Sequence, residues 1–238
     1  MKWRLAFGVL VGLQIACILG EASQFCSEHA ASCKPEITIR VYDYSALPEV
    51  IARRASTEAD RIFAEAGVKL RWAVCPVSAE TLPGDPQCHF RALSTDIRLN
   101  LLTAEMAKEI APDHGKFGAA FPLKNGFGNL AAVFPERIRE FAASRGAPEA
   151  LLLGHFIAHE IGHLLLGVDS HSKSGLMNVP WDRAQIERAF VGTLLFSRQD
   201  AERMKRQVAG RVQAASSRRR GRLPEYRSRE ELETLARR

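Results

Sequence analysis

The 238-residue sequence contains no internal repeat, no pair of cysteines in CxxC spacing and no series of long apolar runs. Aromatic residues make up only 8% of the chain and charged residues 25%, which are ordinary values for a globular protein. This composition argues against an intrinsically disordered chain, a collagen-like chain and a polytopic membrane protein. The length suits one domain with appendages better than two equal domains.

Most of the positive charge lies at the C-terminal end of the chain. Lys and Arg number 33 against 27 Asp and Glu, which gives a formal charge of +6. Residues 213–238 hold eight arginines and four glutamates and so carry +4, whereas residues 23–212 carry +1. We expect residues 213–238 to form a basic, flexible tail that makes at most weak contacts with anionic surfaces. Nucleic acid is not an expected partner of the nearly neutral body.

The first 22 residues have the organisation of a secretory signal peptide. Lys2 and Arg4 precede an apolar run from Leu5 to Leu19, and Gly20 and Ala22 place small residues before a cleavage site. We expect cleavage after Ala22 and a secreted or periplasmic protein. An uncleaved membrane anchor is the alternative, but the run is short for a bilayer span and is interrupted by glycines, so no stable membrane span is expected.

Export determines how the five cysteines are interpreted. Cleavage would remove Cys17 and leave Cys26, Cys33, Cys75 and Cys88 in an oxidising compartment, which favours two disulfides. Three pairings are possible. We favour Cys26–Cys33 and Cys75–Cys88 because each closes a short loop. A zinc site made of these cysteines is disfavoured because none of them forms a CxxC pair.

Five segments of the body have the pattern of β-strands. Apolar and polar residues alternate over residues 37–42, 68–75 and 96–101, which predicts three strands. Two weaker candidates cover residues 117–121 and 129–134.

Three segments have helical spacing. They run from Pro48 to about Ala66, from near Pro148 to Leu166 before Gly167, and from Ser197 towards residue 212. The order of strand, helix, several strands and then helices indicates an α+β or mixed α/β domain over residues 23–212.

The second of these helices carries the motif His159-Glu160-Ile161-Gly162-His163. Positions i and i+4 lie one turn apart on the same face of a helix, so both imidazoles can bind one metal ion. Glu160 is placed to accept a proton from a metal-activated water rather than to bind the metal. No Ser or Cys nucleophile arrangement and no phosphate-binding glycine pattern competes with this motif.

The run HEIGHLLLGVDSHSKSGLMN, residues 159–178, resembles the metzincin zinc metalloproteases, and its ending is most similar to the matrix-metalloprotease branch. The resemblance covers about twenty residues and otherwise only the order of strands and helices. By position, His159 and His163 match the helical zinc ligands and Glu160 matches the general base. Met177 matches the methionine of the turn beneath the metal.

The resemblance has implications for fold and activity. It implies a zincin-like, twisted and mostly parallel sheet with an antiparallel edge strand, an active-site helix and a C-terminal helix. It also implies an exported, Zn²⁺-dependent endopeptidase whose peptide or protein substrate pairs along the edge strand. Residues 117–121 are the better candidate for that strand because they precede the strand that leads to the active-site helix. We expect a monomer.

The third zinc ligand departs from the family pattern HExxHxxGxxH. Leu166 stands at the position of the family's glycine, and Asp169 stands at the position of its third histidine. The nearest glycine, Gly167, comes one residue after the expected glycine position, and His171 comes two residues after the expected histidine position. We favour His171 because it has the expected residue type and lies correctly before the methionine turn. Asp169 is the alternative ligand, and otherwise it could orient an imidazole. No tyrosine follows Met177, so the oxyanion role that a tyrosine has in some relatives is unsupported.

Two other functions fit the sequence. The altered spacing would suit a zinc-binding protein of the same fold with lost or restricted proteolysis. A module that binds anionic surfaces through its basic tail is the other alternative. Its zinc would be structural, because His159, His163, His171 and Asp169 could supply four ligands.

Overall fold

The computed structural model describes residues 35–78, 85–123, 127–167 and 170–220. The expected signal peptide, the expected Cys26–Cys33 disulfide, Asp169 and residues 221–238 lie outside the described residues. Within the described ranges, no helix is both long enough and apolar enough to span a membrane.

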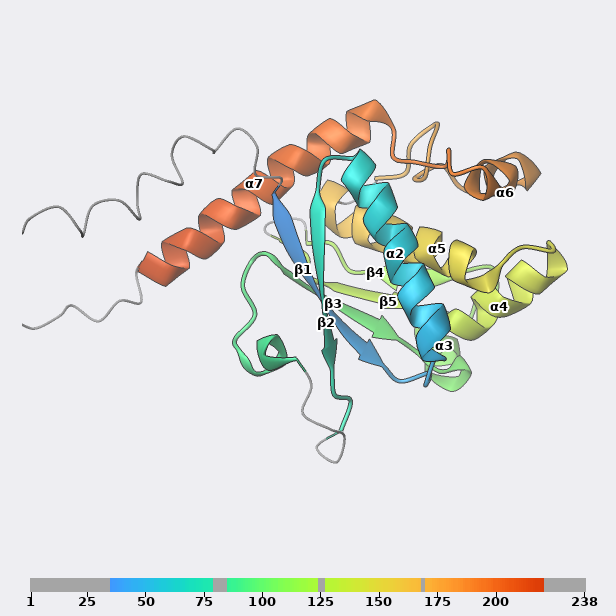
Figure 1. Cartoon of the computed structure of the whole chain (residues 1–238), viewed down its shortest axis with the longest axis horizontal. Helices are drawn as coiled ribbons and strands as arrows, with labels where there is room; N and C mark the ends of the chain where they lie inside the picture. The colour runs from blue at the N-terminus through green and yellow to red at the C-terminus, as the bar shows by residue number, and fades with distance from the viewer. Residues whose placement is uncertain (1–34, 79–84, 124–126, 168–169, 221–238) are drawn as a thin grey trace, which may run out of the picture. The chain divides into compact units, whose positions relative to one another are not determined.

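A five-stranded sheet forms the centre of the fold (Figure 1), in the order β2-β1-β3-β5-β4. Strands β1, β2, β3 and β5 are parallel, and β4 pairs antiparallel with β5 at one edge. The mixed α/β fold, with its mostly parallel sheet and antiparallel edge strand, is therefore confirmed. The strands are β1 (Glu36–Asp43), β2 (Lys69–Cys75), β3 (Asp96–Leu101), β4 (Gly118–Ala120) and β5 (Leu130–Val133).

Alternating apolar side chains of the sheet enter the main hydrophobic core. Ile37 and Ile39 of β1 and Ile97 and Leu99 of β3 are fully buried, and the core also contains residues of the long helices. The period-two pattern that predicted these strands therefore reflects burial on one face of the sheet.

The predicted long helices are present, together with shorter ones that periodicity did not predict. Helices α2 and α5 pack closely against each other, and a Cβ atom on Gly154 would lie 2.7 Å from the carbonyl oxygen of Ala55. The helices are α2 (Glu49–Glu65), η1 (Pro86–His89, a 3₁₀ helix), α3 (Ala104–Ile110), α4 (Pro135–Ser144), α5 (Glu149–Leu166), α6 (Arg183–Phe190) and α7 (Arg198–Arg220).

The last helix, α7, continues into the segment that the sequence assigned to the tail. It ends at Arg220, and Ala215 is 7% exposed. The side chain of Arg211 is fully buried and donates hydrogen bonds to the carbonyl oxygens of Ser94, Gly128 and Leu164. Helix α7 therefore extends beyond residue 212, and through Arg211 it binds the end of α5 and two loops.

The disulfide between Cys75 and Cys88 is present and joins the end of β2 to η1. It confirms the second of the two predicted pairings and holds η1 beside the outer strand β2.

Candidate metal centre and active site

Helix α5 carries the first part of the site through the centre of the protein. Nearly all of its residues are buried, including His159 and Glu160, which are each 6% exposed. The helix ends at Gly167, whose φ of 91° is available to glycine at little cost, and the N–H of Gly167 donates to the carbonyl oxygen of His163. The chain then leaves the helix and returns His171 to the two helical histidines.

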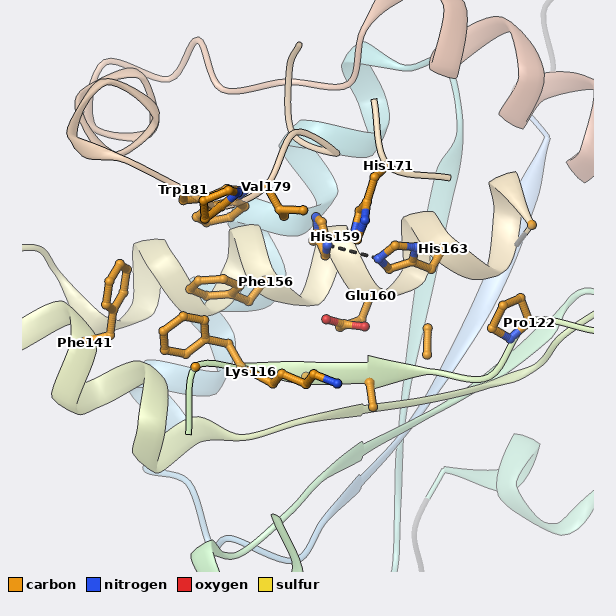
Figure 2. A pocket seen from close by; sticks show the side chains of 17 residues that line it. Lys116, Pro122, Phe141, Phe156, His159, Glu160, His163, His171, Val179 and Trp181 are labelled. Carbon is orange, nitrogen blue, oxygen red and sulfur yellow. Dashed lines mark hydrogen bonds between the residues drawn. The ribbon is translucent and has the colours of Figure 1, made fainter. Parts of the chain in front are cut away.

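The structure brings His159, His163 and His171 together (Figure 2), with one ring nitrogen of each within 4.8 Å of the others. The Nε2 atoms of His159 and His163 are 3.1 Å apart. Two nitrogens bound to a tetrahedral zinc at about 2.0–2.1 Å would be separated by about 3.3 Å. The two helical histidines are therefore already at the spacing that one zinc ion requires.

Hydrogen bonds fix the orientation of both helical imidazoles. Nδ1 of His159 lies 3.1 Å from the carbonyl oxygen of Leu176, which can only accept, so the proton of neutral His159 is on Nδ1. Nδ1 of His163 lies 2.6 Å from the hydroxyl oxygen of Ser170, which can accept a hydrogen bond in the same way. This pattern leaves the Nε2 lone pairs free for a metal ion, as is usual for ligating histidines.

Burial keeps both imidazoles neutral. It lowers the pKa of His159 to about 4, and burial together with the nearby His159 and His171 lowers the pKa of His163 to about 3. A metal ion binds the neutral form of histidine, so no proton has to be displaced from these two side chains at neutral pH.

The Glu160 carboxyl group lies on the side of α5 that faces β4 (Figure 2). A Cβ atom on Gly118 would come within 2.7 Å of its carboxyl group, so only glycine leaves room for it at this position of the strand. Burial raises the pKa of Glu160 to about 8. The group is therefore poised to take up and release a proton near neutral pH.

The turn that carries Met177 packs against α5. Met177 is fully buried, and a Cβ atom on Gly162 of α5 would lie 2.8 Å from its sulfur. The preceding Gly175 has a φ of 75°, and the N–H of Leu176 donates to the carbonyl oxygen of Leu195. Because Leu176 also binds His159, this turn supports the first ligand directly.

A cavity of about 810 Å³ opens onto the cluster and is bounded by α5, β4 and residues 179–181. One end of it is aromatic. Phe156 stacks on Trp181 at 4.3 Å between ring centroids and lies 4.6 Å from Phe117. The ionisable side chains that line the cavity are Lys116, His159, Glu160, His163 and His171.

The sequence identified most of the residues that meet here. The structure brings His159, His163 and His171 together and places Glu160 in the same cavity, whereas Asp169 lies outside the described residues. Sequence reasoning did not identify the residues that orient and accommodate these groups, namely Ser170, the carbonyl group of Leu176, and Gly118. A lone serine and a lone glycine carry no pattern of their own, and their roles depend on chain segments that meet only in the folded protein.

No family model and no curated protein sequence matches the chain. Among solved structures, that of myroilysin aligns with 70% of this chain and 65% of its own, at 13% sequence identity and a TM-score of 0.31. The chain thus spans less than two thirds of the length of myroilysin. At this TM-score the likeness supports no conclusion about chemistry, so the function has to be argued from the site itself.

Proposed function

We propose that this protein is an exported zinc metalloendopeptidase in which His159, His163 and His171 bind the metal and Glu160 is the general base. The observation that carries the proposal is the convergence of three imidazoles beside a buried carboxyl group in one cavity. The resemblance of residues 159–178 to the metzincins supports the same assignment. The Cys75–Cys88 disulfide supports export, because disulfides persist in oxidising compartments.

The donor set fits a catalytic zinc. Three neutral imidazoles are a known ligand set for catalytic zinc, in which the fourth position is left to water or substrate. Among the residues that the structure describes, no Cys, Asp or Glu joins the three histidines within ligand distance. A structural zinc site would normally be closed by four protein ligands, so three histidine ligands favour a catalytic zinc site.

Glu160 would carry the proton in peptide hydrolysis. Zinc held by the three imidazoles would supply Lewis acidity, which makes water a better nucleophile and a carbonyl carbon a better electrophile. A cation nearby also favours the ionised form of Glu160 over the protonated form. Its carboxylate would take a proton from the attacking water and deliver it to the amine nitrogen as the C–N bond breaks.

The walls of the cavity suit a peptide. Strand β4 is the outer strand of the sheet beside Glu160, so its free edge could accept an extended chain as an additional strand. The aromatic end, with Phe141, Phe156 and Trp181, would accommodate a large apolar side chain.

A chelation experiment tests this function. The protein lacking residues 1–22 should cleave members of a peptide library, lose that activity on treatment with 1,10-phenanthroline, and regain it when zinc is added. Cleavage that survives removal of the metal would contradict the proposal. A zinc-loaded protein that is inert on the whole library would instead indicate a zinc-binding protein without general proteolysis.

A further inference from the structure

We propose that the substrate-binding edge of this protein, over the residues that the structure describes, donates two backbone hydrogen bonds, from Gly118 and Ala120, and so binds about three substrate residues. This inference rests on the proposed function and concerns the length of the peptide that the site recognises. It follows from the hydrogen bonds on either side of β4 and from one proline.

The pairing of β4 with β5 determines which residues of β4 face outward. Phe134 donates its N–H to the carbonyl oxygen of Phe117, and Phe121 donates its N–H to that of Leu130. In an antiparallel pair, hydrogen-bonded and non-hydrogen-bonded positions alternate. The register of the pair therefore directs the N–H and C=O groups of Gly118 and Ala120 away from β5 and towards the open edge. Among the described residues these four groups have no partner.

The outward series ends at Lys116 on one side. Lys116 would be the next outward-facing residue before Gly118. However, its N–H donates to the carbonyl oxygen of Asp113 at 3.2 Å, and its carbonyl oxygen accepts from Arg137 at 3.0 Å. Arg137 is itself 8% exposed and also binds the carbonyl oxygen of Ala111, so this end of the edge is held by buried bonds.

The series ends at Pro122 on the other side. Pro122 is the next outward position after Ala120, and proline has no N–H to donate. Its ring lines the cavity, and Figure 2 shows it at the opposite end of β4 from Lys116. In the described part of this edge, the N–H donors available to a substrate are therefore those of Gly118 and Ala120.

The position of Glu160 orients the substrate on this edge. Its carboxyl group lies against Gly118, so the reacting bond would lie near that residue. A peptide antiparallel to β4 runs from Ala120 towards Gly118 and then to the end of the cavity with Phe141, Phe156 and Trp181 (Figure 2). The residue facing Ala120 precedes the one facing Gly118 by two, and the residue two further toward the N-terminus of the substrate would face Pro122, which has no N–H.

A peptide-length series tests this limit. The peptides share one C-terminal half and carry one to five residues on the N-terminal side of the cleaved bond, which mass spectrometry of the wild-type digest locates. Their affinities for zinc-loaded Glu160→Gln protein are measured by fluorescence anisotropy. The dissociation constant should fall up to about the third residue. The fourth residue should change it less than about twofold, because it faces no outward group of the edge. The fifth should gain at most the one hydrogen bond that the carbonyl oxygen of Pro122 can accept, and a hydrogen bond contributes roughly two- to tenfold.

Two variants should change the number of substrate residues that the edge binds, one by adding an N–H donor and the other by removing one. Pro122→Ala in the same background restores an outward N–H and should tighten binding of the longer peptides by about two- to tenfold, with no gain for the three-residue peptide. Ala120→Pro removes a donor that β5 does not use, so it should weaken all peptides of three or more residues while keeping the melting temperature.

The outcomes separate this inference from the proposed function. Affinity that keeps rising about tenfold through the fifth residue in the unmodified edge would overturn the two-donor limit, even if wild-type protein cleaves every peptide. The expected plateau without any cleavage by wild-type protein would support the limit and contradict the peptidase proposal. If Ala120→Pro fails to fold, the length series and Pro122→Ala still decide the matter.

Discussion

Individual hydrogen bonds prepare the histidines for metal binding. His159 and His163 each engage Nδ1 with an oxygen atom and present Nε2 to the cluster. The motif predicted which residues would meet, because i and i+4 share a helix face. It could not predict Ser170 or the carbonyl group of Leu176, because these partners come from the chain after the helix and depend on how that chain folds back.

The identity of the third ligand can be tested by comparing two substitutions. His171→Ala should weaken zinc binding by at least about 100-fold, because it removes one of three ligand nitrogens. Asp169→Ala should weaken it by less than about tenfold, since an outer group only orients a ligand. Competition with a chromophoric chelator measures both affinities. If Asp169→Ala weakened zinc binding more than His171→Ala did, Asp169 would be the third ligand.

The raised pKa of Glu160 predicts how the stability of the metal-free protein varies with pH. Folding raises this pKa from 4.5 to about 8, so the unfolded chain ionises first and the free energy of unfolding falls as the pH rises between these values. Folding lowers the pKa values of His159 and His163 from 6.5, so their contribution is instead lost as the pH falls below 6.5. Between pH 6.5 and 8, the change of the unfolding free energy with pH therefore depends mainly on Glu160.

The matched variant is Glu160→Gln, which cannot ionise. Between pH 6.5 and 8, metal-free wild-type protein should lose roughly 1–2 kcal/mol of unfolding free energy relative to this variant, because one pKa unit corresponds to about 1.4 kcal/mol. Urea unfolding of both proteins across this range measures the difference. Parallel curves would show that the carboxyl group does not resist ionisation in the folded state.

At the scale of elements, the close approach of α5 to the methionine turn supports the ligands. Gly162 faces the sulfur of Met177 and the ring of Phe196, both within 2.9 Å of the place a Cβ atom would take. Gly162→Ala should therefore destabilise the protein by about 1–3 kcal/mol, as overpacked core sites do.

Gly210→Ala in α7 is the control for this substitution. There, a Cβ atom would meet only Phe127, at 3.7 Å, which is an ordinary contact. The control should be neutral or stabilise the protein by up to about 1 kcal/mol, because alanine favours helix more than glycine does. Thermal unfolding of the zinc-loaded proteins compares the two. Equal changes in melting temperature for the two substitutions would mean that the turn that carries Met177 moves to make room for the added methyl group without loss of stability.

The sequence predicted the long elements and, as weaker candidates, the short strands β4 and β5, but it missed the short helices. Strands β1 to β3 and helices α2, α5 and α7 have enough buried positions to show a period. Helices α3, α4 and α6 have seven to ten residues, and their signals lie in their first residues instead. The side chain of Thr103 caps α3, and Asp182 and Gln185 form a capping box at α6. The lateral order of the strands depends on contacts between distant segments, which no local pattern specifies.

At the scale of the whole molecule, α7 ties the C-terminal part of the described chain to the active-site helix. Arg203 donates to the carbonyl oxygen of Leu166 and Arg211 to that of Leu164, both at the C-terminal end of α5. A cation stabilises this end of a helix. Burial lowers the pKa of Arg211 to about 10, so it remains charged at neutral pH.

Two truncations separate the helix from the residues beyond it. A chain that ends at Arg220 should keep its zinc content, its activity and, within about 1 °C, its melting temperature. A chain that ends at Val212 loses the buried Ala215 and the last turns of α7, and should melt several degrees lower. Scanning calorimetry measures both. Equal melting temperatures for the two chains would show that residues 213–220 add no stability.

The most direct test of the account is to measure zinc content and peptide cleavage side by side for wild-type protein and Glu160→Gln. Both proteins should hold one zinc ion per chain, because Glu160 is not a ligand, and only the wild type should cleave peptides. Loss of the general base should reduce turnover by about 10²- to 10⁴-fold. A wild-type protein without zinc at neutral pH, or a Glu160→Gln protein that cleaves at the wild-type rate, would contradict the account.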